Sequence, residues 1–187
     1  ILGSTYVSDD AYDRFLKKKV PETEGIRSLV ADTGVTYNHW QAAPWPLEDD
    51  LHPTEWIVAE SRRVIREADT EQPLFLTSSF YAPHPPLFPP KDYFDAYAKQ
   101  SLPAPAQGDW VDWQALSPEG NENGHRVLLE GEALQRAQAG YFGLIEHLDN
   151  QLQSLTHAFR SRSEKAGRPW VIVVTSDHGE MLGDHGF

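Results

Sequence analysis

The chain has 187 residues, 40% of them hydrophobic, with 28 acidic and 16 basic residues that give a formal net charge of −12. This acidic balance disfavours nucleic-acid and anionic-membrane binding, which need a basic surface, and no apolar stretch is long enough to span a bilayer. Cysteine is absent, which excludes disulfides, thiolate metal sites and cysteine nucleophiles within these residues.

The first third of the chain alternates between loop and helix patterns. The basic triplet Lys17–Lys19 is typical of a solvated helix face, and residues 31–53 are expected to form an ordered loop because they contain three prolines and two tryptophans. A helix is predicted from Thr54, with Thr54 as its cap after Pro53. The residues expected on one face of this helix are Ile57, Ser61, Val64, Ile65 and Ala68.

Two apolar runs are predicted to be buried strands. The first, residues 74–80, ends in the proline-rich corner 81–90, where prolines cannot donate hydrogen bonds to a ladder. The second, residues 170–174, is rich in β-branched side chains.

The segment between these two runs is expected to cross from one strand to the other. Residues 101–125 have the composition of a long irregular connection, which Trp110 and Trp113 should hold in order. A helix is predicted over residues 130–160 from its apolar stripe, and strand–helix–strand is the pattern of an α/β fold with a parallel sheet. The stripe consists of Tyr141, Ile145, Leu148, Leu152, Leu155 and Phe159.

A polar corner follows the second predicted strand, at Thr175–Gly179. In an open α/β sheet, ligands and metals bind at the carboxyl ends of strands, and a carboxylate beside an imidazole is a plausible pair of metal ligands. Asp177 and His178 form such a pair. The alternative is structural: Asp177 could cap a helix that begins near Gly179.

His84, between prolines in the first corner, is the other candidate for chemistry. An imidazole held there could act as a general acid, or it could simply bond to the backbone of a rigid loop. His147 is expected to form a hydrogen bond to the sheet or between helices, and His185 could border the pocket or stabilise a turn. The histidines expected at the surface or in loops are His39, His52, His125 and His157.

Two blocks of this sequence resemble the sulfatase family of the alkaline-phosphatase-like superfamily. Residues 175–185, TSDHGEMLGDH, are similar to the family's second metal-binding segment, and residues 75–86, FLTSSFYAPHPP, to its strand with a Pro-His-x-Pro-like corner. Residues 141–149, YFGLIEHLD, and 52–56, HPTEW, add weaker matches in the same order. The resemblance covers most of residues 50–187.

The resemblance implies a site and a fold. Asp177 and His178 would bind one divalent cation, calcium by preference, with manganese, magnesium or zinc as alternatives, and His84 would reach the sulfate and the leaving oxygen. The implied fold is an α/β sandwich with a mostly parallel central sheet flanked by helices. Residues 1–187 would form one incomplete catalytic domain, without its N-terminal nucleophile segment and its C-terminal portion.

The chain departs from the family pattern at the nucleophile. No Cys/Ser-x-Pro-x-Arg segment is present, so the formylglycine that the family uses is expected upstream of this chain. Asp9 and Asp10 follow no convincing apolar strand and are rejected as the family's paired metal ligands. The chain is therefore expected to be an internal part of a larger protein and to have no activity by itself.

The implied function is hydrolysis of small-molecule or carbohydrate sulfate esters, by attack of the formylglycine on sulfur. One alternative is a phosphonate monoester hydrolase or phosphodiesterase of the same superfamily, because these enzymes commonly have a histidine at the position of His178. Two-metal phosphatases are disfavoured. They need an Asp ligand for the second metal at the strand end that corresponds to residues 77–84, and this segment of the chain contains no Asp. A second alternative is a degenerate, non-catalytic binding domain.

Overall fold

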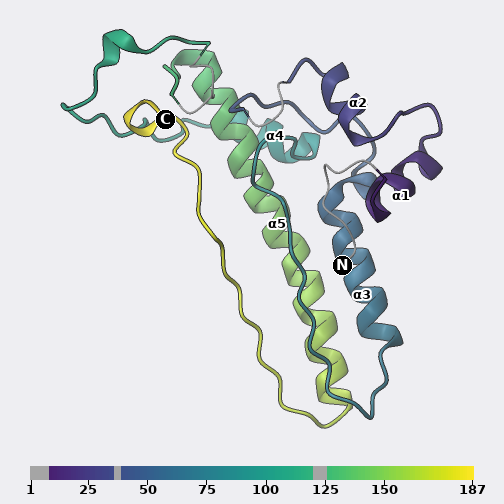
Figure 1. Cartoon of the computed structure of the whole chain (residues 1–187). Coiled ribbons are helices and arrows are strands. Elements are labelled where there is room, and N and C mark those ends of the chain that lie inside the picture. Colours follow the sequence, from purple (N-terminus) through teal and green to yellow (C-terminus); the bar gives the residue numbers. More distant parts are fainter. Residues whose placement is uncertain (1–8, 36–38, 120–125) are drawn as a thin grey trace.

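The computed structural model describes residues 9–35, 39–119 and 126–187 and is built around one long helix, α5 (Figure 1). The α-helices are α1 (Ala11–Lys19), α2 (Ile26–Asp32), α3 (Pro53–Glu67), α4 (Lys91–Ala98) and α5 (Gly131–Lys165). Short 3-10 helices are η1 (Asp49–Leu51), η2 (Trp113–Ala115) and η3 (Asp184–Gly186). Helix α5 has 35 residues, about 52 Å at 1.5 Å per residue. No helix in these three ranges combines the length and the apolar character that crossing a membrane requires.

The prediction of a parallel central sheet is wrong. Within the described ranges, the only strand-like pairing is an isolated parallel bridge between Ala42 and Leu87. Residues 74–80 and 170–174 are extended, as their β-branched and aromatic composition favours, but each lies along α5 and neither pairs with the other (Figure 1). A ladder requires a neighbouring strand about 4.8 Å away, and these segments have none in the described part of the chain.

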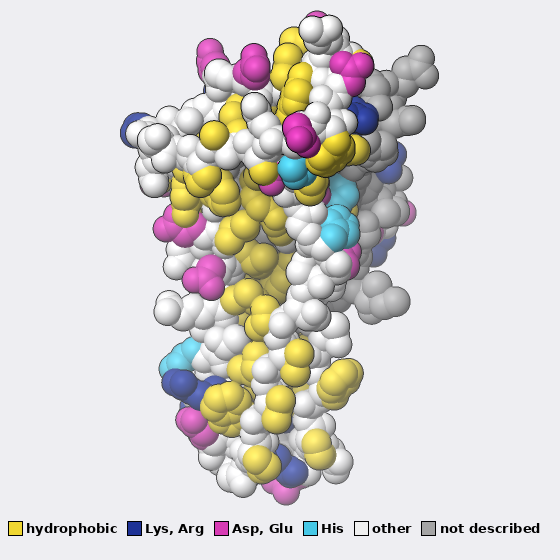
Figure 2. Space-filling model, turned by 90° about the vertical axis from the view of Figure 1, so that its left-hand side faces the viewer, with side chains coloured by type: hydrophobic (Ala, Val, Ile, Leu, Met, Phe, Trp, Pro, Cys, Tyr) yellow, Lys and Arg dark blue, Asp and Glu magenta, His cyan; other side chains and the backbone are white. Residues whose placement is uncertain are grey.

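Without a ladder, the two segments are also less buried than predicted. In residues 74–80 the side chains alternate: Leu74, Leu76 and Phe80 pack on α3 and α5, whereas Phe75 is 94% exposed. In the second segment Val171 and Val173 are 79% and 80% exposed. Figure 2 shows hydrophobic side chains as a column down this face of the molecule. The side chains of the first run therefore alternate in burial with a period of two, and only one face of the run is covered.

Helix α3 confirms the helix predicted from residue 54, with a different cap. Its first residue is Pro53, whose missing N–H costs nothing at that position, and the cap is His52, whose Nδ1 accepts from the backbone N–H of Thr54 at 3.1 Å. Thr54 is inside the first turn and is buried. The expectation that Thr54 caps the helix is therefore wrong by two positions.

Helix α5 confirms the helix predicted at 130–160 and extends to Lys165. Its buried face contains small residues that let other backbone approach closely. A Cβ atom at Gly140 would lie 2.5 Å from Ala42 Cβ and 2.9 Å from Leu87 Cβ. Helices α3 and α4 pack on α5. The apolar stripe expected to face a sheet is only partly covered, and Ile145 is 41% exposed.

The N-terminal helices pack on the proline-rich corner through an aromatic cluster. Tyr12 of α1 and Trp56 of α3 meet edge to face, with ring centroids 5.6 Å apart, and Phe88 of the corner is buried in the same cluster. Asp10 caps α1 by accepting from the N–H of Asp13. The basic end of α1 is solvated as predicted, because Lys18 and Lys19 are exposed and Lys17 pairs with Asp13 at 2.8 Å.

Candidate functional site

The proline-rich corner, residues 81–90, is fixed to the start of α3 by a buried histidine, His52. His52 Nε2 lies 3.0 Å from the carbonyl oxygen of Phe88, and since a carbonyl can only accept, Nε2 carries the proton. Both ring nitrogens of His52 are therefore bonded, one to the corner and one to the start of α3. The corner is also fixed by the N–H of Trp45, which donates to Pro89 O at 2.8 Å.

Burial and, to a smaller extent, the charge of the nearby His147 lower the pKa of His52 from 6.5 to about 3. His52 is therefore neutral at physiological pH, which its two hydrogen bonds require. His52 does lie in the short bend between η1 and α3, but the expectation that it could be a surface residue is wrong, because it is buried. Its place in the HPTEW string, directly before Pro53, was the only sequence signal of a cap. His39 does lie in a loop and His157 is exposed on α5, while His125 lies outside the described residues.

His84 lies at the turn of the corner, where its backbone N–H donates to Tyr81 O at 3.0 Å. Its Nδ1 is 2.6 Å from Pro85 O, so Nδ1 donates and Nε2 is left for other partners. The imidazole packs against the Tyr81 ring with centroids 4.4 Å apart. A cavity of about 20 Å³ lies beside it, lined also by His52 and Leu144. The ring is thus oriented by backbone and by an aromatic neighbour.

The second candidate segment, residues 175–181, forms an irregular turn. Asp177 Oδ1 accepts from the N–H of His178 at 3.0 Å, and no helix begins near Gly179. The alternative of Asp177 as a helix cap is therefore wrong. His178 Nδ1 lies 2.9 Å from Gly179 O and donates to it, which leaves Nε2 with its lone pair.

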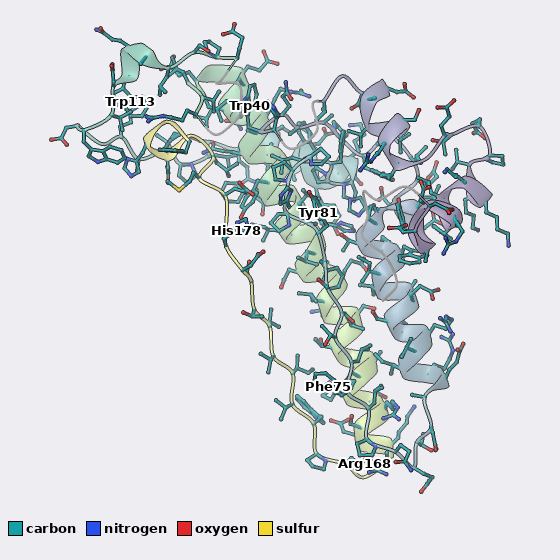
Figure 3. The ribbon with its side chains drawn as sticks, in the orientation of Figure 1. Trp40, Phe75, Tyr81, Trp113, Arg168 and His178 are labelled. Atoms are coloured by element: carbon teal, nitrogen blue, oxygen red, sulfur yellow. The ribbon has the colours of Figure 1, made fainter. Side chains whose placement is uncertain are left out.

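The electrostatics of this turn connect it to the corner. The pKa of Asp177 is lowered by the backbone N–H of His178, by its own N–H, and by the charges of His178 and, more weakly, His84. The pKa of His178 is raised by the carbonyl of Gly179 and by the charge of Asp177. His84 contributes only the weakest of these effects on Asp177, so the turn and the corner, 93 residues apart in the sequence, are only weakly coupled. Figure 3 labels His178 on the C-terminal extended segment and Tyr81, whose ring packs on that of His84, on the other extended segment.

The donor atoms of Asp177 and His178 are compatible with a shared cation. Asp177 Oδ2 and His178 Nε2 are 3.8 Å apart, a separation that one ion bonded to both at about 2.0–2.6 Å can bridge. A carbonyl bonded to the other ring nitrogen is the usual arrangement for a metal-binding histidine. Across the described ranges, no three His, Asp or Glu side chains gather as a ready metal shell. The two residues therefore offer part of a shell and leave positions open.

The last residues of the chain bind the long loop instead of the candidate site. Asp184 accepts from Ala106 N–H at 2.7 Å, and His185 N–H donates to Ala106 O at 2.8 Å. The His185 and Trp110 rings pack with centroids 5.1 Å apart. His185 thus stabilises a turn, one of the two roles expected for it. His147 was expected to form a hydrogen bond either to the sheet or between helices. It forms the second kind, since its Nε2 lies 3.2 Å from Oε1 of Glu55 in α3.

The loop that precedes α5 is irregular as predicted over its described residues. Apart from η2 it has no regular element up to residue 119, and residues 120–125 lie outside the described part of the chain. Trp113 donates from Nε1 to Gly108 O at 3.2 Å and orders the loop, whereas Trp110 is 67% exposed.

A comparison with protein-family models decides the family. The model described as Sulfatase matches residues 9–187, which include both candidate segments and α5 between them. The chain belongs to the sulfatase family. The resemblance drawn from the two blocks is therefore confirmed.

Among the curated relatives of this chain, an arylsulfatase of Clostridium perfringens is 38% identical over 165 residues, covering 88% of this chain and 34% of the relative. The multifunctional alkaline phosphatase superfamily protein PehA of Trinickia caryophylli is 32% identical over 133 residues, 61% of this chain and 25% of the relative. An iduronate 2-sulfatase of Mus musculus is 26% identical over 153 residues, 72% of this chain and 27% of the relative. The chain thus spans about a quarter to a third of the length of the curated relatives it matches.

Proposed function

We propose that this chain is part of the catalytic domain of a longer sulfatase that hydrolyses sulfate esters. The observation that carries the proposal is the match of the sulfatase family model over residues 9–187, which contain both His84 and the Asp177–His178 pair. In this proposal Asp177 and His178 are ligands of one divalent cation, and His84 is a general acid. The formylglycine nucleophile belongs to a segment outside this chain.

The bound cation would supply positive charge to the sulfate oxygens, as metal ions do at anionic reacting centres. Asp177 suits a ligand role because it is exposed and because backbone N–H groups lower the pKa of its carboxyl, which favours the charged form. His178 suits the role because Gly179 holds its Nδ1 proton and so directs the Nε2 lone pair outward. We favour calcium from the resemblance, although calcium prefers a shell of oxygen donors; the imidazole of His178 suits manganese or zinc as well.

His84 is proposed to donate a proton to the leaving alcohol oxygen. Cleavage of a sulfate monoester builds negative charge on that oxygen, and a positioned imidazolium can neutralise it. The Nδ1 bond to Pro85 O leaves Nε2 as the donor atom, and the Tyr81 ring limits the rotation of the imidazole. Orientation of this kind reduces the entropy lost at the transition state.

A phosphonate monoester hydrolase or phosphodiesterase is the second candidate. The similarity to the PehA protein of the alkaline phosphatase superfamily favours it, as does an imidazole at the second ligand position. The arylsulfatase relative is more similar to this chain, and we therefore favour a sulfate ester, of a small molecule or a carbohydrate, as the substrate.

The roles can be separated by two substitutions in the longer protein. We expect His84→Ala to lower turnover of 4-nitrophenyl sulfate by a factor of about 10²–10⁴, the usual contribution of a general acid, with metal content unchanged. We expect Asp177→Asn to lower both turnover and metal content, measured by elemental analysis. Loss of metal from the His84→Ala variant, or retention of metal by Asp177→Asn, would show that the roles are assigned wrongly.

The 187 residues by themselves are expected to release no sulfate, because the proposed nucleophile is not among them. The check is a sulfate-release assay on the purified chain with added calcium or manganese. Detectable turnover above that of the His84→Ala variant of the same chain would overturn this part of the proposal.

A further inference from the structure

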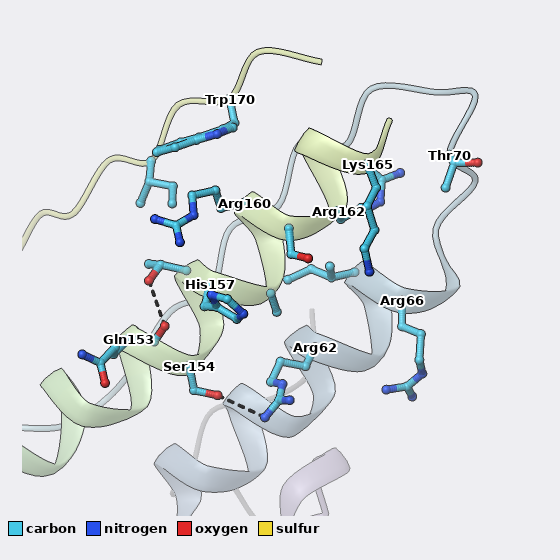
Figure 4. Close-up of a pocket in the computed structure, with 15 residues that line it drawn as sticks. Arg62, Arg66, Thr70, Gln153, Ser154, His157, Arg160, Arg162, Lys165 and Trp170 are labelled. Atoms are coloured by element: carbon cyan, nitrogen blue, oxygen red, sulfur yellow. Dashed lines mark hydrogen bonds between the residues drawn. The ribbon is translucent and has the colours of Figure 1, made fainter. Parts of the chain in front are cut away.

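Far from the candidate site, an open groove with a volume of about 1020 Å³ lies between the C-terminal halves of α3 and α5 and is lined by cationic side chains (Figure 4). We call it the basic groove and define it by Arg62, Arg66, His157, Arg160, Lys165 and Trp170. With Arg162 it collects five of the sixteen Lys and Arg residues of the chain. None of the lining residues, all of them in the described part of the chain, carries a carboxylate.

This concentration of positive charge is unusual because the whole chain has a net charge of −12. We propose that the basic groove binds a sulfated polysaccharide, as a site separate from the reaction centre. The proposal rests on the proposed function, since a sulfate ester hydrolase has a reason to hold a polymer that bears many sulfate groups.

The cations at the rim are available to a ligand. Arg66 and Arg160 have only exposed, long ion pairs, to Glu67 at 3.8 Å and to Glu164 at 3.7 Å. Exposed pairs of this kind contribute little stability, so a ligand can replace them at small cost. The structure shows no ion pair for Lys165 within the described ranges. Arg162 differs, since it donates to Asp69 O at 2.6 Å and so holds the turn after α3.

The spacing of the cations matches a repeating anion better than a single ion. Arg62 and Arg66 are one helical turn apart on α3, about 6 Å, and His157 and Lys165 are about 12 Å apart along α5. One inorganic sulfate cannot touch cations spread over such a distance. Guanidinium groups bind sulfate-like oxygens through two parallel hydrogen bonds, which favours an anion with planar pairs of oxygens.

Trp170 distinguishes among polyanions. Its indole is 42% exposed and forms one wall of the groove, where a flat apolar face complements that of a sugar ring (Figure 4). The groove and the candidate site are separate, since the extended chain from Trp170 to Asp177 spans about 23 Å.

The test is a titration with size-defined dextran sulfate at several salt concentrations, by calorimetry, with neutral dextran, polyglutamate and duplex DNA as parallel probes. The groove variant carries Arg66→Gln, Arg160→Gln and Lys165→Gln. The matched control carries Lys18→Gln, Lys19→Gln and Lys99→Gln, which remove the same charge from exposed positions away from the groove.

We expect dextran sulfate to bind the unmodified chain, and the groove variant to bind it at least tenfold more weakly at 0.1 M NaCl. The slope of log K against log salt should fall by about 2–3, because fewer counterions are released. The control variant should change the affinity less than twofold. Equal loss in both variants, or tighter binding of polyglutamate or DNA than of dextran sulfate, would overturn the proposal.

In the longer protein, turnover of 4-nitrophenyl sulfate separates the two proposals. The groove variant should retain that turnover, because the small substrate does not reach the groove. Turnover without any dextran sulfate binding would refute the basic groove alone. Groove-dependent binding in a protein that does not cleave aryl sulfates would refute the proposed function alone.

Discussion

Replacing His52 with alanine tests whether this residue joins α3 to the corner that carries His84. The change removes the cap of α3, worth about 1 kcal/mol, and leaves the buried carbonyl of Phe88 without its donor, at a cost of about 1–3 kcal/mol. It also removes the edge-to-face contact with Trp45, whose ring centroid lies 5.2 Å away, for about 1 kcal/mol more. We expect the free energy of unfolding to fall by about 4 kcal/mol.

Urea unfolding followed by tryptophan fluorescence measures this loss. His157→Ala is the matched control, because His157 is exposed on α5 and should change the stability by no more than about 0.5 kcal/mol. His52→Asn should recover about 1 kcal/mol of the loss, since asparagine is a preferred cap. A loss below about 1 kcal/mol for His52→Ala would refute the reasoning that this side chain holds the corner.

Four further predictions concern His52, Gly140, residues 171–174 and Tyr81. Lowering the pH from 6.5 towards 3 should destabilise the unmodified chain by up to about 1.4 kcal/mol per pH unit from His52 alone. The reason is that the imidazole of the unfolded chain binds a proton, whereas the buried ring with its lowered pKa does not. Urea titrations at each pH measure the free energy of unfolding, and an equal dependence of that free energy on pH in His52→Asn would contradict this. Gly140→Ala should destabilise the chain by about 1–3 kcal/mol, since the new methyl group meets Ala42 and Leu87, and an unchanged urea midpoint would mean that α5 does not pack there. The backbone N–H groups of residues 171–174 should exchange with deuterium in seconds while those in the middle of α5 are protected, and protection of both would indicate a ladder. In the longer protein, Tyr81→Ala should lower kcat for aryl sulfates about tenfold with little change in KM, because the ring orients His84; a change in KM alone would assign Tyr81 to substrate binding.

The helices of this chain were predictable because their signals are local. The apolar periodicity of residues 130–160 depends only on neighbours one turn apart, and α5 forms where that periodicity predicts it. The family was likewise predictable, because the strings around His84 and Asp177 are specific. The cap of α3 was missed because His52 is an uncommon cap, and serine, threonine, aspartate and asparagine are the usual signals.

The sheet could not be predicted reliably, because pairing is not a local property. Residues 170–174 have the composition of a buried strand, yet composition determines only that the backbone is extended. Whether an extended segment joins a ladder depends on the position of other segments, and the two runs lie along α5 without meeting. The basic groove was missed for the same reason, since Arg62 and Arg160 are 98 positions apart in the sequence and become neighbours only when α3 packs on α5.

The most direct test of the central claim is a comparison of two substrates in the longer protein. Steady-state kcat/KM is measured for 4-nitrophenyl sulfate and for 4-nitrophenyl phenylphosphonate, in the unmodified protein and in Asp177→Asn. We expect the sulfate ester to be the better substrate and its turnover to be lost with the Asp177 carboxylate. A higher kcat/KM for the phosphonate, or sulfate turnover that survives Asp177→Asn, would contradict the account.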